Sequence, residues 1–219
     1  MAQPTKTASQ IITDFELQVS DITELSSVEE LSILNRVYHK VCTERPWEFL
    51  KAVAQGTVLT DATGSYITPP TDFAFFSENN NYTDNSESVQ NNASPKVIFI
   101  IVNGAYNPYQ IINFSDRRQY VNRSGHAYFD TVNNIIRFTV APSGTSYEFD
   151  YIKVPALLTA SDSPIFPGQF HDILTFGMAT ENEIIQLSPK ATSYLPENNA
   201  KYQQYLLNMM YWNSQLYLN

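Results

Sequence analysis

The sequence predicts an α+β protein, in which N- and C-terminal segments form a helical bundle and an antiparallel β-sandwich or barrel-like domain is inserted between them. Near both ends of the chain, apolar residues recur every three or four positions, as in amphipathic helices. Between about 57 and 155 they alternate in short runs that are separated by turn residues. We therefore expect an N-terminal arm and helices at 1–56, the inserted β domain at 57–155 and C-terminal helices at 156–219.

The N-terminal part contains the best-marked helix start. Ser27 and Glu30 fit a capping box, so a helix is expected to begin at Ser27. It should end near Arg45, because the residue before a proline is disfavoured in the α region. A second short helix is expected from Pro46 to about Ala54, with Trp47 as its core anchor rather than an interface residue. Before these helices, the apolar residues at 11–19 indicate a short strand or an extended arm.

Turn residues divide the middle of the chain into strands. Short strands at 57–60 and 65–68 flank a turn, and the apolar run at 96–102 is typical of a central strand covered on both faces. Residues 132–134 read as a hairpin turn, and a strand with a period of two begins at Tyr147. The Asn-rich stretch 77–95 has few apolar residues to bury, so it is either a disordered tip or a docking loop.

The period changes again after residue 155. Three prolines break the chain, and helices are expected at about 168–186 and 196–216. The last helix carries a run of large apolar side chains: Tyr202, Tyr205, Leu206, Met209, Met210, Trp212 and Leu216.

Composition limits the classes of function. The 219 residues are 43% hydrophobic and 16% charged, which is typical of a globular protein. A net charge of −9 disfavours wrapping of a phosphate backbone. The only dense basic cluster is Arg117-Arg118 with Arg123 nearby, either a solvated loop or a contact for an acidic partner. Cys42 cannot form an internal disulfide, and we expect no secretion signal and no membrane span.

No arrangement of residues predicts catalysis, a metal site or a cofactor. The three histidines are far apart in the sequence, and His171 is expected to form structural hydrogen bonds near a helix start. The acids Glu29-Glu30, or Asp61 with Asp72, could form a glycosidase pair, but nothing distinguishes them from surface acids. The many aromatic residues and long polar loops favour a binding or assembly protein over an enzyme.

The order of these segments resembles the head-to-tail adaptor, or connector, proteins of tailed bacteriophages, of the tail tubular A and head-completion types. The resemblance covers most of residues 25–215. It rests on Asn35-Arg36-Val37-Tyr38, the stretch 45–50, and Tyr66 to Phe73, which is similar to the family's Y-x-LP-x-DF pattern with Thr68 in place of Leu. Further matching residues are Tyr151 to Pro155, Leu157, Phe166, Phe170-His171-Asp172-Ile173-Leu174, Tyr202 and Tyr205.

This resemblance implies a structural virion protein of the neck or tail, assembled in the host cytoplasm. It implies a homo-oligomeric ring, commonly twelvefold, that joins the portal protein to the tail or nozzle protein while DNA passes through its centre without sequence-specific binding. The resemblance places the portal interface in the C-terminal segment and the tail or neighbour interface in the loops of the β domain. The portal residues implied are Tyr202, Tyr205, Met209, Trp212 and Tyr217. The loop residues implied are Asn80, Tyr82, Arg117 and Arg118.

Two alternatives stay open at this point. A β domain with exposed Tyr and Asn could bind carbohydrate or a host surface as part of a tail or neck appendage. A hydrolase that uses paired carboxylates is the third hypothesis.

Overall fold

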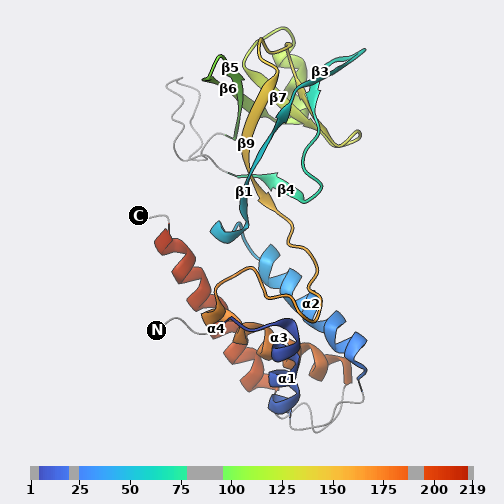
Figure 1. Ribbon diagram of the computed structural model, residues 1–219, viewed down its shortest axis with the longest axis vertical. Coiled ribbons are helices and arrows are strands. Elements are labelled where there is room, and N and C mark those ends of the chain that lie inside the picture. The colour runs from blue at the N-terminus through green and yellow to red at the C-terminus, as the bar shows by residue number, and fades with distance from the viewer. Residues whose placement is uncertain (1–4, 20–24, 78–95, 187–194, 217–219) are drawn as a thin grey trace. The chain divides into compact units, whose positions relative to one another are not determined.

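The computed structural model of the chain describes residues 5–19, 25–77, 96–186 and 195–216. They form two compact units, one from residues 1–50 and 155–219 and the other from residues 51–154. The first, the helical unit, contains the helices of both terminal segments, and the second, the sheet unit, contains every strand of the described residues (Figure 1). The predicted α+β class is therefore confirmed.

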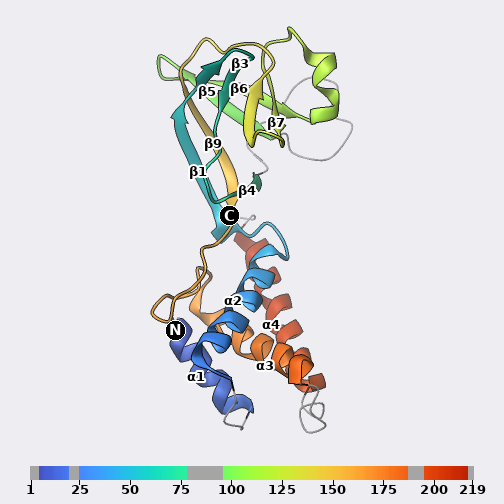
Figure 2. The ribbon, with the colours of Figure 1, turned by 90° about the vertical axis from the view of Figure 1, so that its right-hand side faces the viewer.

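The helical unit is built around α3. Its helices are α1 (Ala8–Val19), α2 (Ser27–Thr43), α3 (Asp172–Gln186) and α4 (Leu195–Leu216), with short 3-10 turns η1 (Glu48–Leu50) and η3 (Gly168–Phe170). α3 packs against each of the other three helices (Figure 2). Segments from the two ends of the sequence thereby share one hydrophobic core.

Gly177 allows this close packing. A Cβ atom at this position of α3 would clash with Cγ1 of Val37 on α2 and would lie 3.2 Å from two ring carbons of Tyr202 on α4. The missing side chain therefore lets three helices meet at one point. Trp47, which follows α2, is fully buried, and its indole N–H donates a hydrogen bond of 2.8 Å to the Val41 carbonyl oxygen. The predicted core role of Trp47 is confirmed.

Three expectations for the N-terminal part are wrong in detail. Residues 8–19 form α1 rather than a strand or an extended arm, because Ala8, Ile11 and Phe15 lie on one helical face and are fully buried. The capping box of α2 uses Ser26 and Glu29, one residue earlier than expected, with Ser26 accepting from the Glu29 N–H. The second helix is only the turn η1, after which strand β1 (Lys51–Thr57) begins.

The sheet unit is a single curled sheet of nine strands (Figure 2). The strands are β1 (Lys51–Thr57), β2 (Leu59–Asp61), β3 (Gly64–Ile67), β4 (Phe73–Phe76), β5 (Val97–Val102), β6 (Ala105–Ile112), β7 (His126–Asp130), β8 (Ile135–Phe138) and β9 (Ser146–Lys153). Their order is β1-β9-β5-β6-β7-β8-β3-β2, with β4 also paired to β9. The apolar face of this sheet buries twelve residues in one cluster: Ala54, Ile67, Phe76, Ile98, Ile100, Tyr109, Ala127, Ile136, Phe138, Tyr147, Phe149 and Tyr151.

The sheet is mixed rather than wholly antiparallel, because β6 and β7 run parallel. The crossover between them contains the 3-10 segment η2 (Phe114–Tyr120). The predicted hairpin turn is confirmed, because residues 131–134 join β7 to β8. Asn103-Gly104 joins β5 to β6 with positive φ angles of 50° and 80°. β5 occupies the predicted central place between β6 and β9, but Phe99 and Ile101 on its second face are only half-buried.

Candidate interaction surfaces

The outward face of α4 carries large apolar side chains in contact with solvent. Leu207 is 64% exposed and Tyr211 is 70% exposed, and their spacing of four residues places them together on one face of the helix. Glu197, Gln203 and Gln204 are other exposed residues of α4. An exposed Leu–Tyr pair on a long, otherwise polar helix face is the kind of surface that a protein partner covers.

The residues that were predicted for the portal interface lie mostly on the other side of α4. Tyr202 and Met209 are buried in the helical unit, and burial raises the pKa of the Tyr202 hydroxyl to about 12. Tyr205 is half-buried and stacks on Phe176, with ring centroids 5.7 Å apart. Trp212 is half-buried and contacts Phe170 at 5.5 Å. Tyr217 lies outside the described residues.

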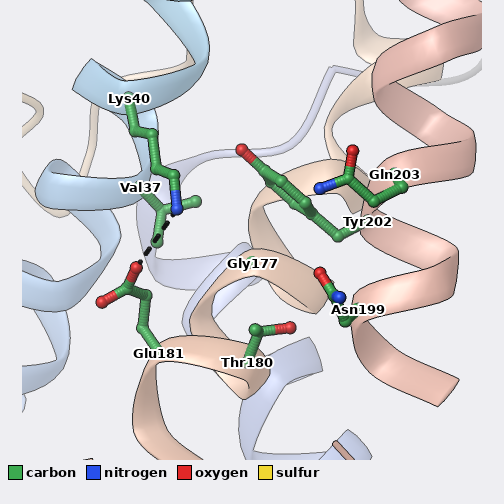
Figure 3. A pocket seen from close by; sticks show the side chains of 8 residues that line it. All are labelled: Val37, Lys40, Gly177, Thr180, Glu181, Asn199, Tyr202 and Gln203. Atoms are coloured by element: carbon green, nitrogen blue, oxygen red, sulfur yellow. Dashed lines mark ion pairs between the residues drawn. The ribbon is translucent and has the colours of Figure 1, made fainter. Parts of the chain in front are cut away.

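A small cleft lies where α2, α3 and α4 meet at Gly177 (Figure 3). Lys40 and Glu181 approach each other across its mouth, with Nζ and Oε1 3.5 Å apart. The Lys40 ammonium also lies 5.8 Å from the centroid of the Tyr202 ring. The cleft follows from the missing side chain of Gly177, and its two charged groups, Lys40 and Glu181, pair with each other, so it points to helix packing rather than to a ligand.

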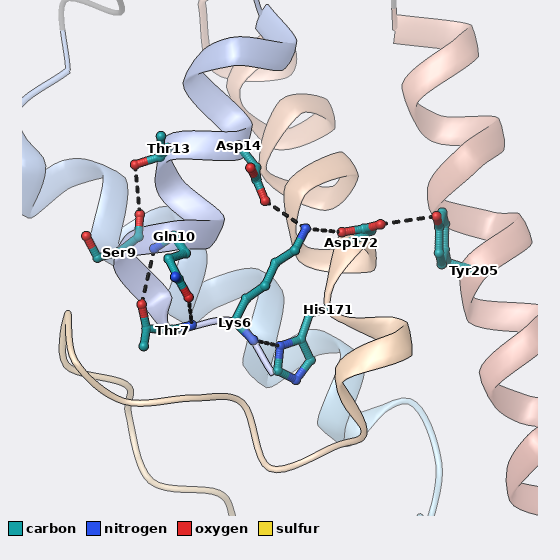
Figure 4. A network of polar contacts seen from close by, with 9 residues as sticks. All are labelled: Lys6, Thr7, Ser9, Gln10, Thr13, Asp14, His171, Asp172 and Tyr205. Atoms are coloured by element: carbon teal, nitrogen blue, oxygen red, sulfur yellow. Dashed lines mark hydrogen bonds and ion pairs between the residues drawn. The ribbon is translucent and has the colours of Figure 1, made fainter. Parts of the chain in front are cut away.

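A polar network joins the N-terminal segment to the start of α3 (Figure 4). Lys6 Nζ lies 2.7 Å from Asp14 Oδ2 and 2.6 Å from Asp172 Oδ1. Burial lowers the pKa of Lys6, but the hydrogen bonds and charges of these two carboxylates outweigh it and raise the pKa overall. Tyr205 donates a hydrogen bond of 3.4 Å to Oδ2 of Asp172, which connects α4 to the same network.

His171 is at the centre of this connection. It is fully buried, and its Nδ1 accepts a hydrogen bond of 3.1 Å from the Lys6 backbone N–H. Its Nε2 lies 3.0 Å from the Phe166 carbonyl oxygen, which can only accept, so Nε2 carries the proton. The predicted structural role of His171 is thereby confirmed. The sequence did not indicate its partner Lys6.

A second exposed surface lies on the sheet unit, in the crossover from β6 to β7. The guanidinium carbon of Arg117 lies 3.7 Å from the centroid of the Phe114 ring, and its Nη1 donates a hydrogen bond of 2.7 Å to the Phe114 carbonyl oxygen. Arg123 lies 5.7 Å from the centroid of the Tyr120 ring, and Arg118 is exposed. We call this surface the arginine surface, and define it as Phe114, Arg117, Arg118, Tyr120, Val121 and Arg123. The structure therefore places Arg117 and Arg118 together, whereas Asn80 and Tyr82 lie outside the described residues.

The acids considered as a hydrolytic pair have separate structural partners. Asp61 forms a bidentate ion pair with Arg137, in which the shorter contact is 2.9 Å. The hydrogen bonds from Arg137 lower the pKa of the Asp61 carboxyl. Asp72 accepts a hydrogen bond of 2.9 Å from the Tyr151 hydroxyl. Glu29 caps α2. Asp61, Asp72 and Glu29 are thus accounted for by local structure.

The described part of the chain contains neither a metal-binding cluster nor a membrane-spanning helix. Within residues 5–19, 25–77, 96–186 and 195–216, no group of three or more His, Cys, Asp or Glu residues could hold a metal ion. None of the helices described there has the length and apolar composition that a membrane crossing requires.

A protein-family model described as SU10 adaptor protein matches residues 6–209, which span both units. A search of curated proteins found no significant match.

Proposed function

This chain belongs to the SU10 adaptor protein family, a family of phage structural adaptors, and we propose that it forms a ring that joins the portal protein to the tail or nozzle protein. The ring contains twelve copies, as the resemblance to head-to-tail adaptors implies. The family match over residues 6–209 carries this proposal, because it includes the helices and the sheet in one continuous alignment.

The portal contact is assigned to the outward face of α4. Leu207 and Tyr211 supply apolar area there, and aromatic residues are enriched in protein interfaces. On the opposite side, α4 packs onto α3 and η3 through Tyr202, Tyr205, Met209 and Trp212. Tyr217 follows α4 in the sequence and is assigned to the same portal contact. Arg117 and Arg118, with Asn80 and Tyr82, are assigned to the contact with the tail or a neighbouring subunit.

The charge of the chain is compatible with DNA passage. A net charge of −9 repels the phosphate backbone, so a channel lined by this protein lets DNA move without binding it.

Electron microscopy of the protein mixed with the portal protein of its own virus tests the proposal. The expected result is a closed ring of copies stacked on the portal, with α4 at the contact. The chain alone and the portal alone serve as controls. A chain that never joins the portal would overturn the proposal and favour binding of carbohydrate or a host surface, which a glycan screen would then measure.

A further inference from the structure

We propose that the arginine surface binds the acidic helical unit of a second copy of this chain. This inference rests on the proposed ring, and it names the contact that holds neighbouring subunits together.

The guanidinium group of Arg117 is oriented before any partner arrives. Arg117 is fixed by its ring contact and its hydrogen bond to Phe114, and the Phe114 ring contacts Tyr128 of β7 at 5.8 Å. The backbone of Arg123 is fixed as well, because its carbonyl oxygen accepts a hydrogen bond of 2.6 Å from the Thr139 hydroxyl. Holding the Arg117 side chain in this way reduces the entropy that binding costs.

These charges have no acidic partner within the described part of the chain. Of its six arginines, three lie at 117–123, and none of these three forms an ion pair with a described residue. The only acid between 113 and 125 is Asp116, whose carboxylate contacts Asn113 and Ser115 instead. An unpaired planar guanidinium is suited to bidentate binding of a carboxylate or a phosphate.

The neighbouring side chains favour a protein partner over nucleic acid. Val121 is 58% exposed and Phe114 is 38% exposed, and both lie within the arginine surface. Arginine and aromatic side chains around exposed apolar area are the composition of a protein interface. Three arginines and one aspartate give the segment 113–125 a charge of only +2, in a chain whose net charge is −9.

The helical unit of another copy has the complementary charge. Residues 1–50 and 155–219 contain thirteen acidic and six basic residues, a net charge of −7, whereas residues 51–154 contain nine acidic and seven basic residues, a net charge of −2. Glu16 on α1 and Glu44 after α2 are exposed and form no ion pair with a described residue. Contact between different surfaces of successive copies is the geometry that closes into a ring.

Carbodiimide cross-linking of an Arg118→Lys variant tests the contact directly. The new amine couples to any carboxylate that lies against position 118. The variant is mixed as isotopically light and heavy copies, and linked peptides are identified by mass spectrometry, both for the free protein at high concentration and for the protein bound to portal. We expect mixed light–heavy peptides that join residue 118 to a carboxylate in 1–50 or 155–219. The parent chain, with Arg118, is the control and gives no link at this position.

Charge reversal supplies a second measurement. Arg118→Glu is expected to weaken self-association, measured by sedimentation velocity, by roughly tenfold or more, which corresponds to about 1.4 kcal/mol. Added salt should also weaken the self-association of the parent chain. Arg36→Glu, at an exposed position of α2, changes the net charge equally and should not weaken association.

Several outcomes would overturn the inference. These are links from residue 118 only to portal or tail protein, no link between copies in either preparation, or equal effects of the two charge reversals. A fluorescent oligonucleotide whose binding is lost in Arg118→Glu while self-association stays unchanged would assign the surface to phosphate instead. Failure of the portal mixture to form a ring would remove the proposed function, while the cross-links of the free protein would still report on the contact between copies.

Discussion

The backbone N–H of Lys6 donates a 3.1 Å hydrogen bond to Nδ1 of His171, which lies 165 residues away in the sequence. The bond requires a neutral imidazole, because a protonated Nδ1 is a donor and cannot accept. The same contact brings the Lys6 side chain between Asp14 and Asp172, so one residue attaches the N-terminal segment to both α1 and α3.

The first prediction is that the helical unit loses stability as the pH falls below about 6.5, the ordinary pKa of histidine. Burial lowers the pKa of His171 in the folded protein, more than its hydrogen bonds and the nearby Asp172 raise it. The unfolded chain therefore binds a proton at a higher pH than the folded chain, and stability is lost towards acid pH. Urea unfolding between pH 5.5 and 7.5, followed by helical circular dichroism, measures this loss.

The control for this effect uses two histidine substitutions. His171→Gln should remove the pH dependence in this window at the cost of lower stability at pH 7.5. His126→Gln, in the sheet unit, should leave the pH dependence of the helical unit unchanged. A pH dependence that persists in His171→Gln would refute the assignment.

Sequence patterns predicted local structure better than they predicted contacts between distant segments. The period of the apolar residues located α2, α3, α4 and β9, since the pattern of each depends on its own residues. The pattern failed at residues 8–19. Apolar residues such as Ala8 and Phe15 fit an extended arm as well as a helix, and only their full burial in the folded unit identifies the helix. The parallel pairing of β6 and β7 depends on the path of the crossover, which no local period encodes.

For the candidate surfaces as well, the sequence predicted local grouping better than it predicted packing between distant segments. The sequence grouped Arg117 with Arg118, because neighbours in the chain stay neighbours in the fold. The resemblance assigned Met209 and Tyr202 to the portal interface by their place in the C-terminal segment, and a place in the sequence does not reveal which face of a helix is covered. Leu207 and Tyr211 could be identified only from the packing of α4.

Gly177→Ala is predicted to destabilise the helical unit by about 1–3 kcal/mol, because the added Cβ overpacks the contact with Val37 and Tyr202. In an unpacked helix the same change would stabilise the helix by about 1 kcal/mol. The sign of the change in unfolding free energy therefore shows whether the added Cβ clashes. Urea unfolding of Gly177→Ala, Val37→Ala and the double variant forms a cycle. Val37→Ala should cost less in the Gly177→Ala background than in the parent, and simple additivity would argue against a clash.

Arg137→Lys is predicted to loosen the edge strand β2. The guanidinium of Arg137 binds both oxygens of Asp61, and a lysine ammonium cannot reproduce this planar pairing. Hydrogen exchange at Leu59–Asp61 should become faster, while exchange in β5 at the centre of the sheet stays the same. Arg118→Lys is the matched control, because Arg118 is exposed and outside this pair. Equal exchange of β2 in both variants would mean that the ion pair does not hold the edge.

The two faces of α4 should respond differently to substitution. Met209→Ala removes a fully buried side chain and is expected to cost about 2–5 kcal/mol of unfolding free energy. Leu207→Asp and Tyr211→Asp change exposed side chains, so stability should change by no more than about 0.5 kcal/mol, while binding to portal in a pull-down or by electron microscopy is lost. Ser32→Asp, at an exposed position of α2, is the control for the added charge and should bind as the parent does. If Leu207→Asp and Tyr211→Asp bind portal normally, the outward face of α4 is not the portal contact, because an aspartate in an apolar interface would leave a buried, unpaired charge.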